Sequence, residues 1–263
     1  MSDGRPGIPE PVKREVRKRC AFGCVLCGSP VFQYDHMIEY SIVKEHNPEN
    51  ITLLCPMHHN EKTVRRLPTG RVQRANAAPA NAAADSTAKH ELYFDSPWNL
   101  FTFAIGTNEW HSKLAEGRLS TVLSVDGGPV LAVKLVDGVP LLRVSLRDAD
   151  NRSVLKIRDN ELTHALHKWD VTFTSKVLSI WNAARDIGLV VVFEENCIRI
   201  VRGNFYANGF QFNVDFPRLR VGGLEMTTCY SEGALLAGIG AESSPDEQRI
   251  IIHENQRGPR FWV

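Results

Sequence analysis

No stretch of this sequence reaches the roughly 18 consecutive apolar residues that a membrane helix needs. Its first ten residues are polar, rich in Gly and Pro, and lack the apolar centre of a secretory leader. Neither sign of charge dominates, since 31 Lys and Arg face 30 Asp and Glu, and no segment repeats at a fixed period. We therefore expect a cytoplasmic protein with no membrane partner.

The charged residues are unevenly distributed along the chain. Residues 1–75 contain 12 Lys and Arg but 8 Asp and Glu, whereas the rest of the chain contains 19 and 22. This distribution predicts that contacts with an anionic partner such as nucleic acid are made near the N-terminal end. The acidic balance of the remainder argues against a main DNA-gripping surface there.

The cysteines are clustered rather than spread evenly. They are Cys20, Cys24, Cys27, Cys55, Cys197 and Cys229. In a reducing cytosol, closely spaced cysteines favour a metal site over a disulfide framework. We expect Cys20 to be a buried packing residue, and Cys197 and Cys229 to lie in the hydrophobic core of the second half.

Two short motifs carry the donors that a zinc ion needs. Cys24 and Cys27 form a C-x-x-C pair before a glycine, and Cys55 and His58 form a C-x-x-H pair after 27 intervening residues. Each motif lets two side chains converge on one ion, and three thiolates with one imidazole suit tetrahedral structural zinc. The alternative, buried thiols with a chance histidine, does not explain the clustering.

Polar residues interrupt an otherwise apolar spacer between these motifs. Residues 31–38 read as an aromatic strand, yet Asp35 and His36 lie within it. A lone Asp-His pair is more often a structural feature than a site. Here, however, Pro56 suits the first turn of a helix, and adjacent helical residues differ by about 100°. His58 can therefore face the zinc while His59 faces elsewhere, with Lys62 and Arg66 on its side.

Taken together, these residues resemble the HNH endonuclease family, whose core is a ββα-metal fold. The resemblance covers about residues 13–66 and follows the order C-x-x-C-G, D-H, N-x-x-L-L-C and H-H-x-x-K-T. One position departs from the pattern, because the fourth zinc ligand of the family is more often cysteine and is His58 here.

The resemblance implies a role for each polar residue of the spacer. His36 corresponds to the general base that deprotonates the attacking water, and Asp35 and His59 correspond to ligands of one divalent cation, Mg²⁺ or Mn²⁺. Asn50 completes the catalytic set by bracing the loop that orients His36. The implied reaction is hydrolysis of DNA to a 5′ phosphate and a 3′ hydroxyl, an activity that suits bacterial defence against foreign DNA.

The strand that contains Asp35 and His36 raises a difficulty. Successive residues of a regular strand point to opposite faces, yet these two must serve one site. The backbone is therefore expected to twist or to leave the strand there. A strand that continues regularly through His36 would weaken the assignment.

Basic residues on either side of the motif are the expected phosphate contacts. They are Arg14, Arg17, Lys18, Arg19, Lys62, Arg65 and Arg66. Such contacts supply affinity rather than sequence preference. The expected partner is DNA, double-stranded in preference to single-stranded, with RNA as an open alternative.

The second half has the pattern of a mainly-β domain. Residues 119–214 alternate short β-branched runs with turn signals, of which Asn208-Gly209 is the strongest for a hairpin. His164 and His167 could suggest a second metal site, but without further ligands a turn between strands is the better interpretation. We expect a sandwich-like or hairpin-rich domain that recognises a target, senses a signal or forms a homo-oligomer.

The expected fold is therefore α+β, with a small zinc-stabilised HNH domain followed by the larger mainly-β domain. Its boundaries fall at residues 1–74 for the nuclease, 75–90 for a linker rich in small residues, and 91–263 for the β domain. Two other hypotheses are a non-catalytic zinc-stabilised nucleic-acid-binding module and an assembly protein. Both leave Asp35, His36 and His59 without a role, which favours the nuclease.

Overall fold

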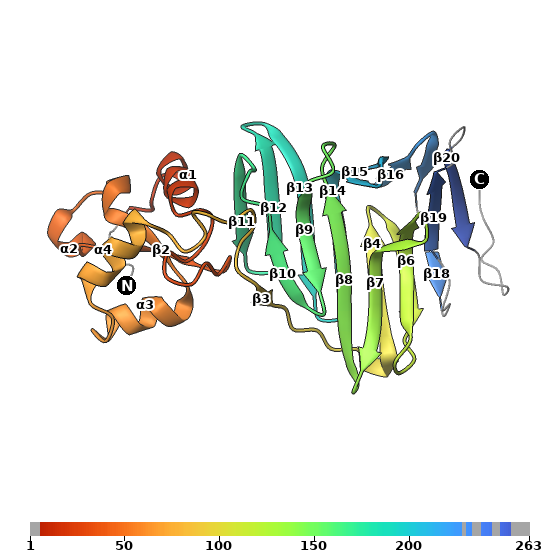
Figure 1. Ribbon diagram of the computed structural model, residues 1–263, viewed down its shortest axis with the longest axis horizontal. Helices are drawn as coiled ribbons and strands as arrows, with labels where there is room; N and C mark the ends of the chain where they lie inside the picture. Colours follow the sequence, from red (N-terminus) through yellow and green to blue (C-terminus); the bar gives the residue numbers. More distant parts are fainter. Residues whose placement is uncertain (1–5, 228–229, 233–237, 244–247, 254–263) are drawn as a thin grey trace. The chain divides into compact units, whose positions relative to one another are not determined.

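The computed structural model describes residues 6–227, 230–232, 238–243 and 248–253, and these fall into two compact units (Figure 1). The first unit comprises Met1–His90 together with Ala165–Thr172, and the second comprises Glu91–His164 with Phe173–Val263. The fold is α+β, as the sequence predicts, with every α-helix of the described residues in the first unit. Within the described residues, no helix has the length and hydropathy to cross a membrane.

The first unit is built around a two-stranded antiparallel sheet. In β1 and β2, Gln33 pairs with Leu54 and His36 pairs with Ile51, and helix α3 follows β2 directly, which completes a ββα arrangement. The elements of this unit are α1 (Glu10–Arg19), β1 (Gln33–His36), α2 (Tyr40–Val43), η1 (Pro48–Asn50), β2 (Ile51–Leu54), α3 (Pro56–Thr63) and α4 (Thr69–Ala77).

Local sequence favours helices α1 and α3 at their observed positions. Helix α1 has Glu10 in its first turn and Arg17, Lys18 and Arg19 in its last, which complements the helix dipole at both ends. Helix α3 begins at Pro56, because a proline at the first helical position loses no intrahelical hydrogen bond. The sequence-based prediction of a helix start at this proline is confirmed.

The hydrophobic core of the first unit is small. Its fully buried aliphatic residues include Val16, Ile51, Leu53, Leu54 and Val72. Cys20, Cys24 and Cys55 belong to the same cluster, so thiols make up a substantial part of this core. A core of this size gives limited stability on its own.

Residues 75–90, the expected linker, lie within the first unit. The Asn81 side chain is buried and donates hydrogen bonds to the carbonyl oxygens of Gly28, at 2.9 Å, and Ala21, at 3.2 Å. Gly28 has φ +75°, and a Cβ there would lie 2.1 Å from Asn81 Oδ1, so the close approach requires glycine. This segment therefore packs against the loop of the first cysteine pair.

The segment Ala165–Thr172 joins the first unit from a distant part of the sequence. Ser86 and Ala165 form an isolated antiparallel bridge, and the Leu166 N–H donates to the Asp85 carbonyl oxygen at 3.2 Å. His164 ends strand β10 and Asp170 begins β11, so the residues between them form the expected connection between strands. Among the described residues, no group of metal-binding side chains includes His164 or His167.

The second unit is a curled, hairpin-rich sheet (Figure 1). Most neighbouring strands are antiparallel, and parallel pairings join β4 to β14, β5 to β18 and β6 to β19. Its strands are β4 (Leu100–Ile105), β5 (Asn108–Lys113), β6 (Leu119–Val125), β7 (Gly128–Val136), β8 (Val139–Arg147), β9 (Ser153–Arg158), β10 (Glu161–His164), β12 (Val177–Ala183), β13 (Asp186–Glu194), β14 (Cys197–Ala207), β15 (Phe210–Asp215), β16 (Arg218–Val221), β17 (Leu224–Met226), β18 (Tyr230–Glu232), β19 (Gly238–Ser243) and β20 (Gln248–His253), with a 3-10 turn η2 (Pro97–Asn99) before β4. The division between the units falls within β3 (His90–Glu91) and β11 (Asp170–Thr174).

The Asn208-Gly209 hairpin is confirmed. These two residues connect β14 to β15 with φ of 45° and 85°, the positive values that a type I′ turn needs. Across this hairpin Phe205 pairs with Phe212, and their rings stack with centroids 5.0 Å apart. Cys197 is buried, which raises its pKa to about 12, and Cys229 lies outside the described residues.

Candidate metal centres and active site

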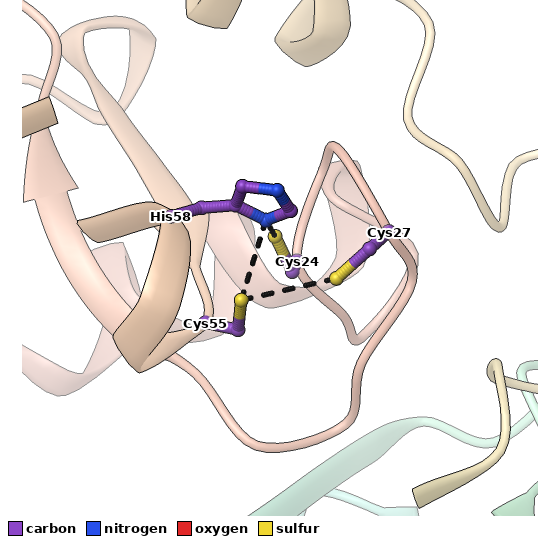
Figure 2. Close-up of side chains that lie close together, drawn as sticks. All are labelled: Cys24, Cys27, Cys55 and His58. Carbon is purple, nitrogen blue, oxygen red and sulfur yellow. Dashed lines mark hydrogen bonds between the residues drawn. The ribbon is translucent and has the colours of Figure 1, made fainter. Parts of the chain in front are cut away.

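Three thiols and one imidazole converge in the first unit (Figure 2). The donor atoms of Cys24, Cys27, Cys55 and His58 all lie within 4.8 Å of one another. His58 Nδ1 is 3.4 Å from Cys24 Sγ and 3.3 Å from Cys55 Sγ, and Cys27 Sγ is 3.8 Å from Cys55 Sγ. The four residues that the sequence predicts as zinc ligands are therefore together.

The spacing of these donors fits zinc. Bonds of about 2.3 Å to sulfur and about 2.1 Å to nitrogen at tetrahedral angles place donor atoms about 3.5 to 3.8 Å apart. The S–S and S–N distances in the cluster lie close to that range. The cluster fits structural zinc, because its four side chains supply all four ligands of a tetrahedral site.

Ionisation of the thiols agrees with a metal-binding role. A hydrogen bond from Cys27 lowers the pKa of Cys24 to about 4 against the opposing effect of burial. The same contact, together with burial, raises the pKa of Cys27 above its usual range. A cation at the cluster would replace the thiol proton of Cys27, because thiolates rather than thiols bind metals.

A second polar cluster lies beside the ββα elements. Asp35, His36, His59 and Lys62 line an open hollow of about 1040 Å³, together with Tyr40 and Arg65. Asp35 and His36 are buried in the fold, and His59 is partly exposed. The structure therefore brings the predicted base and both predicted ligands of the catalytic cation to one cavity.

Strand β1 continues regularly through His36, which is the outcome that weakens the sequence argument. Asp35 pairs with Thr52 and His36 with Ile51, without a bulge. Four consecutive residues, 34–37, nevertheless line the hollow. Strand β1 ends at His36, and the chain leaves the two-stranded sheet directly after this residue.

Each carboxylate oxygen of Asp35 lies near a nitrogen of a basic side chain. Lys62 Nζ lies 2.7 Å from Oδ2, and His59 Nε2 lies 3.6 Å from Oδ1. Within the described residues, Asp35 Oδ2 is buried and accepts no well-aligned hydrogen bond. The ion pair with Lys62 therefore offsets the cost of burying this charged oxygen. Asp35 Oδ1 and His59 Nε2 are the two atoms of this pair that could bind a divalent cation together.

Asn50 holds the backbone that follows His36. Its Oδ1 accepts the Ile38 N–H and its Nδ2 donates to the Ile38 carbonyl oxygen, both at 2.8 Å. The Met37 N–H also donates to the Asn50 carbonyl oxygen at 2.8 Å. This is the arrangement expected of a residue that braces the loop after the base, without itself entering the chemistry.

Sequence reasoning missed two residues next to His36. His46 Nδ1 lies 3.2 Å from His36 Nε2, and Tyr40 packs edge-on against His36 with ring centroids 5.5 Å apart. Their presence in a short spacer after a D-H pair was the available signal. Single aromatic residues in a loop have many other uses, so this signal predicts little without coordinates.

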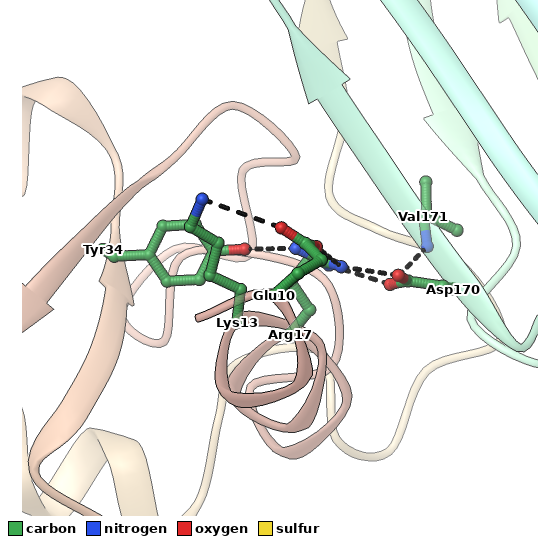
Figure 3. Close-up of polar contacts among 6 residues, drawn as sticks. All are labelled: Glu10, Lys13, Arg17, Tyr34, Asp170 and Val171. Carbon is green, nitrogen blue, oxygen red and sulfur yellow. Dashed lines mark hydrogen bonds and ion pairs between the residues drawn. The ribbon is translucent and has the colours of Figure 1, made fainter. Parts of the chain in front are cut away.

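Arg17 differs from its expected role as a phosphate contact (Figure 3). It is 2% exposed, and its Nε and Nη2 donate to the Asp170 carboxylate at 2.8 and 2.5 Å. Burial alone would lower the pKa of Arg17, but hydrogen bonds to Asp170, Glu10 and Tyr34 raise it above its usual range. A buried, bidentate arginine holds the fold and is closed to DNA.

Three other expected phosphate contacts are also engaged within the first unit. The Arg14 guanidinium lies over the Trp169 ring at 4.1 Å, Arg19 donates to the Ile51 carbonyl oxygen at 2.5 Å, and Lys62 pairs with Asp35. Lys18, Arg65 and Arg66 are exposed, although Arg66 has an ion pair with Glu61 at 3.1 Å. Of these three, Arg65 lines the hollow that contains Asp35 and His36.

Comparison with known families agrees with this site. Residues 24–65 match the family model described as HNH endonuclease, so the HNH domain expected in the N-terminal part is confirmed. The matched segment begins at the first zinc-cluster cysteine and contains Asp35, His36, Asn50 and His59. The match supports a nuclease-like function with nucleic acid as the general class of substrate. Neither curated proteins nor solved structures gave a match.

Proposed function

We propose that this protein is a metal-dependent endonuclease that hydrolyses phosphodiester bonds of DNA, with double-stranded DNA as the preferred substrate. One observation carries the proposal: Asp35, His36 and His59 line the same hollow within the segment that matches the HNH family model. Residues with these roles at one cavity are what phosphodiester hydrolysis requires.

His36 is the proposed general base. A neutral imidazole accepts a proton from water at physiological pH, and the oxygen of that water then forms a bond to phosphorus. The bond from phosphorus to the 3′ oxygen breaks, and this oxygen takes up a proton from solvent. The products are a 5′ phosphate and a 3′ hydroxyl.

Asp35 and His59 are the proposed ligands of the catalytic cation. Mg²⁺ or Mn²⁺ held there would stabilise negative charge on the phosphate and on the departing 3′ oxygen. Lys62 offsets the negative charge of the buried Asp35 carboxylate through its ion pair. Lys18, Arg65 and Arg66 supply exposed positive charge for the DNA backbone.

A second candidate function is that of a non-catalytic zinc-stabilised nucleic-acid-binding module. The ion pair between Lys62 and Asp35 favours this function, because the ammonium group of Lys62 balances the carboxylate charge without a metal ion. The two functions differ in one outcome: a binding module retains DNA affinity but leaves a plasmid intact whichever divalent cation is added.

Conversion of supercoiled plasmid to nicked and linear forms tests the proposal. Zinc-loaded protein should convert the plasmid in Mg²⁺ or Mn²⁺ and stop on chelation, and His36→Ala should lose at least about 100-fold in rate, the size of a general-base contribution. The exposed His167 provides a matched control, since His167→Ala should cleave normally. Equal rates for His36→Ala and wild type would rule out His36 as the base.

A further inference from the structure

A second hollow, of about 310 Å³, lies on the sheet of the second unit. Three arginines line it, and we call it the arginine hollow: Arg185, Arg202 and Arg220. Two aspartates, Asp186 and Asp215, line it as well, so cationic side chains outnumber carboxylates there. The acidic balance of the second half of the chain therefore does not extend to this hollow.

The register of three neighbouring strands gathers polar side chains on the solvent face of this sheet. Strand β15 pairs with β14 on one side and with β16 on the other, which aligns Asn204, Asn213 and Arg220 in one row. Successive residues of a strand point to opposite faces, so the residues that follow or precede this row face the core. Those that are buried on the core face are Phe205, Phe212 and Leu219. The apolar core of the sheet thus fixes the polar row on the outside.

Carboxylates engage the three arginines only in part. Arg202 Nη2 lies 3.7 Å from Asp215 Oδ1, and both side chains are more than half exposed, so this ion pair contributes little. Arg220 donates to Glu225 through Nε, at 2.8 Å. Arg185 lies in the turn between β12 and β13 and has no ion pair within the part of the chain that the structure describes. An anion can therefore reach guanidinium N–H groups without breaking a buried contact.

The rest of the lining adds a hydrogen-bond donor and space. Asn213 Nδ2 and Gln211 Nε2 both donate to Asn204 Oδ1, at 2.6 and 3.4 Å, so the other polar group of Asn204 is an N–H donor. Gly203 lines the hollow with backbone alone, and a Cβ there would lie 2.8 Å from the Gly188 carbonyl oxygen. The close approach of β13 and β14 thus requires a residue without a side chain, which leaves room for a ligand.

This lining suits the phosphate group of a nucleic acid rather than its bases. Guanidinium groups bind phosphate oxygens through paired N–H donors. Among the described residues that line the hollow there is no aromatic ring on which a base could stack, and its apolar members are Ile187 and Val214. A ligand here is held by its phosphate, and such contacts supply affinity without sequence preference.

We propose that the arginine hollow binds a phosphate of the DNA backbone, with Arg185, Arg202 and Arg220 as donors and Asn204 Nδ2 as a further one. The proposal rests on the proposed function in one respect, that DNA is the macromolecule on which the protein acts. It gives the second unit a nucleic-acid contact of its own, made without any residue of the HNH segment.

The affinity of three variants for duplex DNA tests the site. Full-length, zinc-loaded protein is titrated into a short, fluorescently labelled duplex without a divalent cation, which keeps the DNA intact. Arg185→Gln should weaken binding about fivefold and reduce the slope of log affinity against log salt by about 1, as loss of one phosphate contact does. Arg143→Gln, the matched control, removes an exposed arginine of strand β8 outside the hollow and should change both little. Asp215→Asn removes a carboxylate from the hollow and should strengthen binding about two- to fivefold.

The opposite signs expected for Arg185→Gln and Asp215→Asn separate binding from folding, because misfolding cannot produce a gain in affinity. Unchanged affinity in Arg185→Gln, an equal loss in Arg143→Gln, or no gain in Asp215→Asn would overturn the proposal. Titration with a deoxynucleoside monophosphate separates the two sources of phosphate. Tight binding of the monophosphate that Arg185→Gln abolishes, with duplex affinity unchanged, would assign the hollow to a free nucleotide and overturn the contact with DNA. A wild type that binds the duplex but leaves plasmid intact in Mg²⁺ and Mn²⁺ would contradict the nuclease function alone, because the affinities would still decide the site.

Discussion

The two units of this protein are stabilised by different means. The second unit contains five fully buried phenylalanines, Phe101, Phe103, Phe205, Phe210 and Phe212, and a continuous ladder of strand pairs. The first unit has a small aliphatic core supplemented by thiols, a closed set of four metal donors and the buried ion pair of Arg17 with Asp170. The comparison indicates that the unit with the candidate chemistry depends on polar and metal interactions, whereas the other depends on apolar burial.

Zinc should give the largest separation between the two units. Structural zinc contributes about 10–16 kcal/mol of apparent binding free energy to small domains, so Cys27→Ser should unfold the first unit and leave the sheet of the second intact. Metal analysis and circular dichroism should find about one zinc per chain in wild type and loss of helix signal in the variant. Cys20→Ala is the matched control, because Cys20 is buried outside the cluster.

The identity of the fourth ligand sharpens this prediction. His58→Cys should retain zinc, because a fourth thiolate preserves a closed tetrahedral set. Absence of zinc from the wild-type protein, or full helix content in zinc-free Cys27→Ser, would contradict a metal-dependent first unit.

The buried pair of Arg17 and Asp170 should give the next largest effect. Asp170→Ala leaves a buried guanidinium without its bidentate partner, which costs about 3–5 kcal/mol in the free energy of unfolding. Urea unfolding followed by a helix-specific signal measures this cost. Asp215→Ala, which removes an exposed partner of Arg202, should cost less than about 1 kcal/mol. Similar losses in both variants would show that the pair at Arg17 contributes little.

The same pair tests where the domain boundary falls. A fragment of residues 1–90 contains Arg17 but lacks Asp170, so we expect it to bind zinc and to be less stable than the same unit in the full chain. Adding a peptide of residues 165–172, which contains Asp170, should raise the stability of the fragment if this segment belongs to the first unit, and should have no effect if the unit ends at the predicted linker of residues 75–90. A fragment with the full stability of the intact unit would support that simpler division.

Phe205→Ala is the converse test on the second unit. Removal of a fully buried aromatic ring from a packed core costs about 3–5 kcal/mol. The loss should appear in the β-sheet signal, with zinc content unchanged. Loss of zinc from this variant would break the comparison, since it would show that folding of the first unit depends on the core of the second.

Alkaline pH should have the smallest effect. Burial raises the pKa of Tyr34 to about 12, although the nearby Arg17 lowers it. The unfolded chain releases this proton near pH 10 and the folded unit only near pH 12, so the free energy of unfolding falls as pH rises through that window. Tyr34→Phe should lose this part of the pH dependence. An identical pH profile in the variant would show that Tyr34 does not cause it.

The parts of this structure that sequence predicts well are those encoded by neighbouring residues. The two cysteine motifs, the proline at the start of α3 and the Asn208-Gly209 turn each specify local geometry within a few residues. The HNH pattern allows prediction over a longer segment, because it specifies the type, order and spacing of several residues together. Local rules also predicted a mainly-β second half from its repeated turn signals.

The parts that sequence missed depend on distant residues. Arg17 was expected at a DNA surface, because nothing near it shows that its partner lies 153 positions later in the chain. Lys62 was expected to face phosphate and pairs with Asp35 instead, a contact across helix α3 and strand β1. A cationic side chain on a helix can face solvent or pair with a carboxylate of the same protein, and the tertiary structure determines which of the two occurs.

Analysis of product ends most directly tests the central claim, that the first unit hydrolyses DNA through His36. Wild-type protein and His36→Ala, both zinc-loaded, should be incubated in Mg²⁺ with a duplex labelled at either end. The account predicts fragments with 5′ phosphate and 3′ hydroxyl ends from wild type and almost none from His36→Ala. Intact duplex with wild type in both Mg²⁺ and Mn²⁺, or the same fragments at equal rates from both proteins, would contradict it.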